Sequence, residues 1–266
     1  MTIGLIGCGK MGSALTLGAI KKGVFESHQV LAYDPVPEAI AALGDGISAA
    51  GSLEEAIQES DILLLCVKPY QVSEILAKIP TLVESPEKLL VISIAAGVKI
   101  ETMERSCNHE ARIVRTMPNT PALVGEGAAA FTLGKNATDA DADFTAKLLG
   151  SIGIVYEVKE SLLDTVTGLS GSGPAYVYTF IEALADGALL EGLPRDQALA
   201  LATQTVLGAA RMVANSGEHP SVLRDRVTSP GGTTIAGLAA LEEGAFRSSA
   251  INAVKAATEK ARDLGR

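Results

Sequence analysis

One short loop of the sequence carries residue types that could bind and orient a small anion. It is the run Ser229-Pro230-Gly231-Gly232-Thr233-Thr234, which precedes an apolar, alanine-rich segment from Ile235 to Leu241. Two glycines after a proline predict a turn whose backbone can approach a ligand closely. If the next segment is a helix, its first N–H groups, its positive dipole end and two hydroxyls meet at one spot. These groups would hold a small carboxylate; the alternative is a threonine-capped helix without a ligand.

A second candidate site lies near the start of the chain, after the strand expected over Thr2–Ile6. It is the turn Gly7-Cys8-Gly9-Lys10-Met11-Gly12, and the segment from Ser13 to Lys22 is expected to be a helix. Strand, G-x-G-x-x-G turn and helix are the context of the dinucleotide-binding fingerprint. The first glycine makes the tight turn, the second admits the pyrophosphate, and the third lets the helix pack on the strand. The sequence therefore predicts a dinucleotide site; a plain strand–helix turn is the alternative.

A carboxylate follows the second expected strand, Gln29–Tyr33. Asp34 lies 22 residues beyond Gly12, close to the spacing at which a carboxylate binds the ribose hydroxyls of a dinucleotide. None of the next side chains, Pro35 to Glu38, could neutralise a 2′-phosphate, so this segment favours NADH over NADPH. The alternative is that Asp34 caps a helix beginning near Pro35.

The elements that would position these residues alternate between strand and helix. Strands expected over 61–67, 89–94 and 111–116 end at Val67-Lys68-Pro69, Ala95-Ala96-Gly97 and Met117-Pro118-Asn119-Thr120-Pro121. Helices are expected over 37–43, 53–59, 70–79, 99–107 and 140–149, with further strands over 128–132 and 153–158. This alternation predicts a Rossmann-type, doubly wound, mostly parallel sheet. Such sheets bind ligands at the carboxyl ends of their strands.

The sequence changes character at residue 160, beyond which no strand-like run occurs. Five helices are expected over 174–191, 195–215, 219–227, 235–243 and 246–264. We therefore predict two domains, a nucleotide-binding domain over 1–159 and an all-helical domain over 160–266. Helices that are apolar on more than one face must bury those faces, and a second subunit is the simplest cover.

The composition limits which binding partners and which cellular compartment are expected. A net charge of −9 without a long basic cluster argues against nucleic acid. Three scattered cysteines predict reduced thiols in a cytoplasmic protein, with no disulfide frame or zinc site. No charged leader precedes the first strand, and the longest apolar helix contains Glu182 and Asp186. Neither a secretory leader nor a membrane span is therefore expected.

The proton chemistry of a nicotinamide enzyme limits the class of substrate. Dehydrogenases that act on alcohols need a base, usually His or Lys, but the three histidines are expected at surface or capping positions. β-Hydroxyacid dehydrogenases carry Lys and Asn after a glycine-rich turn; Val177 and Ile181 occupy those positions here. A C=N bond fits better, because it needs only a hydroxyl near its nitrogen and an anchor for any carboxylate. Thr234 and the backbone of residues 231–233 provide both.

Taken together, these segments resemble those of the pyrroline-5-carboxylate reductase family over the whole chain length. The matching segments are residues 67–69, 93–97, 117–121, 166–176, 192–195 and 229–235. The resemblance implies a Rossmann domain followed by a helical domain that interlocks with a second subunit, with dimers often assembling into decamers. It also implies reduction of L-1-pyrroline-5-carboxylate to L-proline by NADPH or NADH, the last step of proline biosynthesis.

The resemblance also implies roles for individual residues. Gly9, Lys10 and Met11 would line the cofactor phosphates, while Val67, Lys68, Pro69, Ala95, Ala96 and Gly97 would border the ribose and nicotinamide, with Asn119 also in the cofactor site. Ser229 and the N–H groups of Gly231, Gly232 and Thr233 would hold the substrate carboxylate. The Thr234 hydroxyl would face the ring nitrogen while hydride reaches C5, and the loop would serve a cofactor bound with help from the partner chain. Lys68 is expected to contact the cofactor rather than donate a proton.

One segment departs from the family pattern. Many members have Ser, Arg or similar residues after the second strand, where this chain has Asp34-Pro35-Val36-Pro37. This departure weighs against NADPH. Two alternatives stay open: another imine or 2-oxoacid reductase on the same fold, and a dinucleotide-binding protein without turnover.

Overall fold

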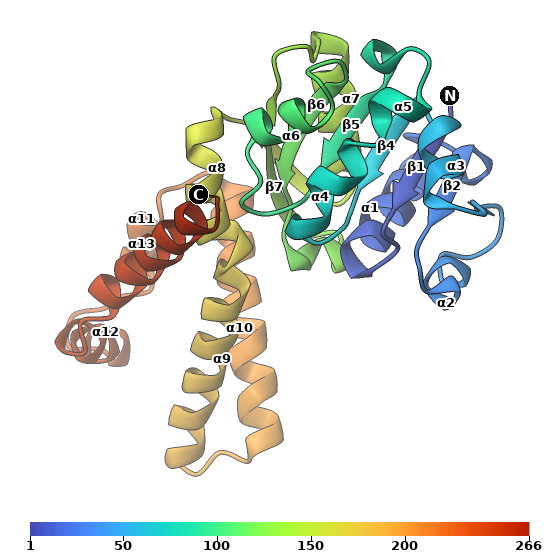
Figure 1. The fold of residues 1–266 in the computed structure, drawn as a ribbon. Coiled ribbons are helices and arrows are strands. Elements are labelled where there is room, and N and C mark those ends of the chain that lie inside the picture. The colour runs from blue at the N-terminus through green and yellow to red at the C-terminus, as the bar shows by residue number, and fades with distance from the viewer. Residues whose placement is uncertain (266) are drawn as a thin grey trace. The chain divides into compact units, whose positions relative to one another are not determined.

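A computed structural model describes residues 1–265 (Figure 1). The strands are β1 (Ile3–Ile6), β2 (Val30–Tyr33), β3 (Ser48–Ala49), β4 (Ile62–Leu65), β5 (Leu90–Ser93), β6 (Arg112–Met117), β7 (Gly127–Leu133) and β8 (Gly153–Glu157). The helices are α1 (Lys10–Lys21), α2 (Pro37–Ala41), α3 (Leu53–Gln58), α4 (Pro69–Leu76), α5 (Ile79–Leu82), α6 (Ile100–Ser106), α7 (Asp139–Gly150), α8 (Glu160–Val166), α9 (Gly173–Leu190), α10 (Arg195–Ser216), α11 (Pro220–Arg226), α12 (Thr233–Glu243) and α13 (Phe246–Leu264).

The strands of the described residues form one sheet in the order β3-β2-β1-β4-β5-β6-β7-β8. All neighbours pair in parallel except β6 and β7, which are antiparallel. The register sets Ile6 beside Tyr33 on one side and Leu65 on the other, so three parallel strands end at the same level. The predicted fold, a mostly parallel Rossmann-type sheet followed by helices, is confirmed.

Helices cover both faces of this sheet (Figure 1). On one face, Leu15 of α1 and Leu148 of α7 join a core cluster with strand residues. On the other, Ile57 of α3, Val72 of α4 and Met103 of α6 do the same. Strands enclosed in this way lose the polar alternation of half-exposed strands, which explains why β4 reads Ile-Leu-Leu-Leu and is buried throughout.

Three elements differ from the sequence prediction. The strand β3 spans only two exposed residues and was not expected. The single helix expected over 70–79 is two helices, because Pro80 near the start of α5 cannot donate a helical hydrogen bond to the preceding turn. The helix α8, also not expected, packs against β6 and β7.

The chain divides into two compact units. Unit 1 comprises Met1–Ser172 together with the chain from Lys255 onward, and unit 2 comprises Gly173–Val254. This division lies beyond the expected boundary at residues 159–160, because α8 belongs with the sheet. The helix α13 begins in unit 2 and ends in unit 1.

A buried arginine holds α8 on the sheet. The guanidinium of Arg115, in β6, donates to Glu160 and Asp164 of α8, both at 3.1 Å. The side chain of Arg115 is only 5% exposed, so its charge depends on these two partners. Glu160 also accepts from the backbone N–H of Ile100 at 2.7 Å, which joins α8 to the start of α6. These contacts of Arg115 and Glu160 therefore hold α8 against the sheet and against the start of α6.

We expect Arg115→Met to lower the free energy of unfolding by about 3–5 kcal/mol, because two partly buried carboxylates lose their cation. Urea titration followed by circular dichroism measures the change. Arg105→Met is the matched control: Arg105 pairs with Glu101 on an exposed helix face, and its loss should change stability by about 0.5 kcal/mol or less. Equal effects of the two substitutions would contradict the structural role given to Arg115.

Unit 2 buries little of its own apolar surface. Its helices α9 and α10 pack around Ala185, Ala198 and Ala202, and the rings of Phe180 and Phe246 lie 5.4 Å apart. Large apolar side chains elsewhere on the unit are exposed in the single chain, among them Leu184, Leu199, Leu201, Leu207, Met212, Ile235 and Leu241. Among the described helices, none is long and apolar enough to cross a membrane.

Candidate active site

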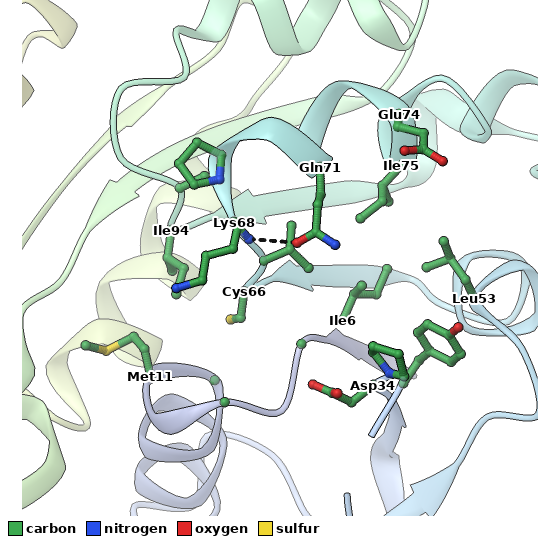
Figure 2. Close-up of a pocket in the computed structure, with 18 of the residues that line it drawn as sticks. Ile6, Met11, Asp34, Leu53, Cys66, Lys68, Gln71, Glu74, Ile75 and Ile94 are labelled. Carbon is green, nitrogen blue, oxygen red and sulfur yellow. Dashed lines mark hydrogen bonds between the residues drawn. The ribbon is translucent and has the colours of Figure 1, made fainter. Parts of the chain in front are cut away.

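A cavity of about 770 Å³ opens in unit 1 at the carboxyl ends of the parallel strands (Figure 2). A volume of this size is typical of sites for small molecules and cofactors. The predicted residues that line it are Gly7, Gly9, Lys10, Met11, Gly12, Asp34, Val67, Lys68, Pro69, Ala95 and Ala96. The structure thus brings most of the predicted cofactor residues together around one space.

The glycine turn at the base of the cavity has the shape that a phosphate cradle needs. Gly7 has φ +95°, and a Cβ there would lie 2.4 Å from the Cys66 carbonyl oxygen. A Cβ on Gly12 would lie 2.2 Å from the Gly7 carbonyl oxygen, so α1 could not pack against the turn. Gly9 differs, because a Cβ there meets no atom within 4 Å. The open space over Gly9, at the start of α1, suits a pyrophosphate held by backbone N–H groups.

Asp34 is bound to the glycine turn through its own carboxylate. Its Oδ2 accepts from the Cys8 N–H at 2.8 Å, and its Oδ1 accepts from the Val36 N–H at 2.9 Å. The helix α2 begins later, at Pro37 with Val36 as its N-cap, so Asp34 does not cap it. Each carboxylate oxygen can accept a further bond, which leaves capacity for two ribose hydroxyls.

Lys68 sits between β4 and α4, directly before Pro69. The Gln71 side chain accepts from the Lys68 N–H at 3.1 Å, which fixes the start of α4. In Figure 2 the Lys68 amine extends across the cavity toward the side where Met11 and Ile94 lie. A cation there can offset phosphate charge.

Two neighbouring thiols, of which only Cys66 lines the cavity, are kept protonated. Burial, with the nearby Asp34 carboxylate, raises the pKa of Cys8 to about 12. Burial, with the neighbouring Cys8, raises the pKa of Cys66 to about 12. Because only the thiolate is nucleophilic, neither cysteine is suited to covalent chemistry at neutral pH.

We therefore expect Cys66, which lines the cavity, to react with iodoacetamide at least about a hundredfold more slowly at pH 8 than the same residue in urea-unfolded protein. The rate in the folded protein should rise about tenfold with each pH unit up to pH 10 or beyond, since the pKa lies higher. The unfolded chain, with an ordinary thiol pKa of about 8.5, should approach its plateau near pH 10. Peptide mass spectrometry resolves the individual cysteines. Rapid labelling of folded protein at pH 8 would show a thiolate and contradict the assignment.

Three predicted cofactor residues do not line the cavity. The Cys8 side chain is 4% exposed and belongs to the core beside α1. Gly97, the residue after Ala96, is buried. Asn119 uses its amide within the protein: Nδ2 donates to the Ser170 carbonyl at 3.0 Å, and Oδ1 accepts from the Ala128 N–H at 2.8 Å. Asn119 thus joins the start of β7 to a π-helical turn at Thr167–Gly171.

Sequence reasoning also missed several residues of the cavity wall. They are Ile6, Tyr33, Pro35, Leu53, Cys66, Gln71, Glu74, Ile75 and Ile94. Ile6 and Tyr33 could have been found, because each is the last residue of a strand that precedes a predicted ligand segment. Gln71, Glu74 and Ile75 share one face of α4 at helical spacing, a signal that becomes visible once α4 is placed against the strand ends.

The other candidate segment is the loop of residues 229–234, which lies in unit 2. The Ser229 carbonyl accepts from the Gly232 N–H at 3.1 Å, which closes a turn, and Gly231 has φ +65°. The helix α12 then begins at Thr233, with Gly232 as its N-cap and no side-chain cap. The turn therefore uses the Gly232 N–H, while Thr233 and Thr234 lie in the first turn of α12, where N–H groups lack helical partners.

Comparison with known proteins identifies the family. A family model described as pyrroline-5-carboxylate reductase dimerisation matches residues 160–264, and one described as NADP oxidoreductase, coenzyme F420-dependent, matches residues 2–97. Curated pyrroline-5-carboxylate reductases from Pisum sativum and Escherichia coli (strain K12) are 47% and 42% identical to this chain. Both matches cover 99% of this chain, and 96% and 98% of those proteins. The chain belongs to the pyrroline-5-carboxylate reductase family.

Solved structures of pyrroline-5-carboxylate reductases agree with this assignment. The Plasmodium falciparum pyrroline carboxylate reductase, solved with NADP bound, has a TM-score of 0.89 and 36% identity, covering 100% of this chain and 98% of that one. The Coxiella burnetii enzyme has a TM-score of 0.93 and 31% identity with the same coverage. Pyrroline-5-carboxylate reductases are NAD(P)H-dependent oxidoreductases that reduce pyrroline-5-carboxylate to proline in proline biosynthesis. The chain is an oxidoreductase of this kind, and its helical part corresponds to the self-association domain.

Proposed function

We propose that the cavity of unit 1 binds the reduced dinucleotide and that the loop of residues 229–234 binds L-1-pyrroline-5-carboxylate. The observation that carries this proposal is the match to pyrroline-5-carboxylate reductases over 99% of the chain. The cavity supports it further, since open space over Gly9 and the N-terminus of α1 fit a pyrophosphate. The dinucleotide, when bound, supplies the hydride that reaches C5 of the substrate.

The loop has the groups that this substrate needs. The Ser229 hydroxyl and the N–H groups at the start of α12 hold the ring carboxylate, which the positive end of the helix dipole also favours. The Thr234 hydroxyl donates a hydrogen bond to the ring nitrogen. This bond orients the C=N group and stabilises the nitrogen as its bonding changes. Gly231 and Gly232 leave the backbone open to the ligand.

The direct test follows the loss of absorbance of the reduced nicotinamide with L-1-pyrroline-5-carboxylate as substrate, in parallel assays with NADH and NADPH. Rapid oxidation that yields L-proline supports the proposal. Oxidation with other cyclic imines or 2-oxoacids alone would reassign the substrate. Dinucleotide binding without any oxidation would indicate a binding protein.

We also propose that NADH is preferred over NADPH, because the Asp34 carboxylate would repel a 2′-phosphate while accepting from ribose hydroxyls. Asp34→Asn removes the charge at nearly constant shape. The ratio of kcat/KM for NADH to that for NADPH should fall about tenfold. Asp45→Asn, at an exposed carboxylate outside the cavity wall, is the control. A ratio that Asp34→Asn leaves unchanged would show that Asp34 does not discriminate.

For assembly, we propose an interlocked homodimer, with further association to a decamer, in the cytoplasm. The exposed apolar side chains of α9, α10 and α12 support a second copy as their cover. Sedimentation equilibrium distinguishes these states. A monomer at micromolar concentration would contradict the proposal, and a stable dimer would contradict only its decameric part.

A further inference from the structure

The turn that follows β5 forms one wall of the cavity. Ala95 and Ala96 line the cavity, and the next residue, Gly97, is buried and has φ +79°. On the sheet side, the Ser93 hydroxyl accepts from the Ala95 N–H at 3.3 Å, and the Ser93 carbonyl accepts from the Thr116 hydroxyl at 3.0 Å. The first half of the turn is therefore fixed by buried groups of neighbouring strands.

The second half of the turn is covered by residues that are distant in sequence. A Cβ built on Gly97 would lie 3.4 Å from the Leu264 Cβ and 3.6 Å from the Gly265 nitrogen. A Cβ built on Gly265 would lie 2.8 Å from the Gly97 carbonyl oxygen. At Gly265 the absence of a side chain permits this approach, whereas at Gly97 the contacts are ordinary van der Waals distances and the φ of +79° is what favours glycine.

The end of α13 is well placed to act as a brace. From Lys255 onward it belongs to unit 1, and Thr258 and Ala261 are 6% and 5% exposed. Leu264 is 68% exposed as a residue, and the atoms of it that lie nearest to the turn are its Cβ and its main-chain carbon. The contact therefore depends on the position of the main chain at residues 264–265, and little on the leucine side chain beyond Cβ.

We propose that the main chain at residues 264–265, with the Cβ of residue 264, positions the dinucleotide: it braces Gly97 and so holds Ala95 and Ala96 in the wall that the cofactor would contact. The inference rests on the proposed use of the cavity for NADH or NADPH. Because the brace shapes the cofactor wall and touches no reacting atom, its loss should weaken cofactor binding and leave the chemical step intact.

Three variants of the full enzyme test this inference. Gly265→Val places a side chain against the Gly97 carbonyl, so either the helix end or the turn must move. Deletion from Leu264 onward removes the brace. Leu264→Ala is the matched control, because it keeps the Cβ and main-chain atoms that contact the turn. The readouts are the Kd for NADH from its fluorescence, the KM and kcat with pyrroline-5-carboxylate, and the Tm.

We expect Gly265→Val and the deletion to raise the Kd and KM for NADH about threefold to tenfold, with kcat at saturating NADH and the KM for pyrroline-5-carboxylate unchanged. Leu264→Ala should match the wild type. A lower Tm with unchanged NADH affinity would reduce the brace to a purely structural role and overturn the inference. An equal effect of Leu264→Ala would overturn it as well, since the side chain would then be responsible. If the wild type binds NADH but reduces no imine, the proposed reaction fails, whereas the Kd comparison still decides this inference.

Discussion

Replacing Thr234 by alanine is expected to lower kcat/KM for pyrroline-5-carboxylate about a hundredfold to a thousandfold, the effect of removing one preorganised donor from an active site. The proposed hydrogen bond to the ring nitrogen is made by the hydroxyl alone, and alanine cannot replace it. Within the described residues, this hydroxyl makes no hydrogen bond, and Thr234 is half-buried at the start of α12. The substitution should therefore leave the fold intact.

The Kd for NADH of Thr234→Ala and the activity of a second variant, Thr234→Ser, separate a loss of catalysis from a loss of cofactor binding. The Kd for NADH should be unchanged, because the cavity wall consists of unit 1 residues and Thr234 belongs to unit 2. Thr234→Ser keeps the hydroxyl and should restore most of the activity that Thr234→Ala loses. Near-wild-type turnover of Thr234→Ala would remove Thr234 from the proposed catalytic role.

Substituting valine for Gly9 is expected to raise the Kd for NADH by about a hundredfold or more, because the side chain would occupy the proposed path of the pyrophosphate. Gly9 has an extended backbone, with φ −70° and ψ −178°, which any residue can adopt. No protein atom lies within 4 Å of the new Cβ. The protein should therefore fold normally and lose its cofactor.

Gly12→Val provides the contrast. Its Cβ would lie 2.2 Å from the Gly7 carbonyl oxygen, so this variant should lose stability as well as binding. Thermal unfolding combined with NADH fluorescence resolves the two effects. Wild-type NADH affinity in folded Gly9→Val would show that the pyrophosphate does not pass over this turn.

The fold was predictable wherever the hydrophobic pattern is strong. The buried strand β4 and the amphipathic helix α13, which was expected over the residues it occupies, are examples. The strand β3 has only two exposed residues, so it carries no pattern. The helix α8 depends on Arg115, 45 residues away from Glu160, and such pairing is invisible to local propensity.

For the candidate site, too, local motifs were predictable from the sequence, and contacts between distant segments were not. Gly7, Gly9 and Gly12 lie together on the cavity, because a turn of fixed geometry is encoded within six residues. Asn119 does not line it, since its amide is used by Ser170 and Ala128. Gly97 is covered by Leu264. Both outcomes depend on segments that only the folded chain brings together. The roles proposed for the loop of residues 229–234 stay predictions until the variants are measured.

The discontinuity of unit 1 has a consequence for biosynthesis. Because its last piece begins at Lys255, the ribosome must translate all of unit 2 before residues 264–265 can contact Gly97. A nascent chain stalled near residue 172 would hold the sheet, the glycine turn and the cavity wall without that contact. The proposed affinity of the cavity for NADH should therefore mature late, after the helices on either side of the loop of residues 229–234 have emerged from the exit tunnel.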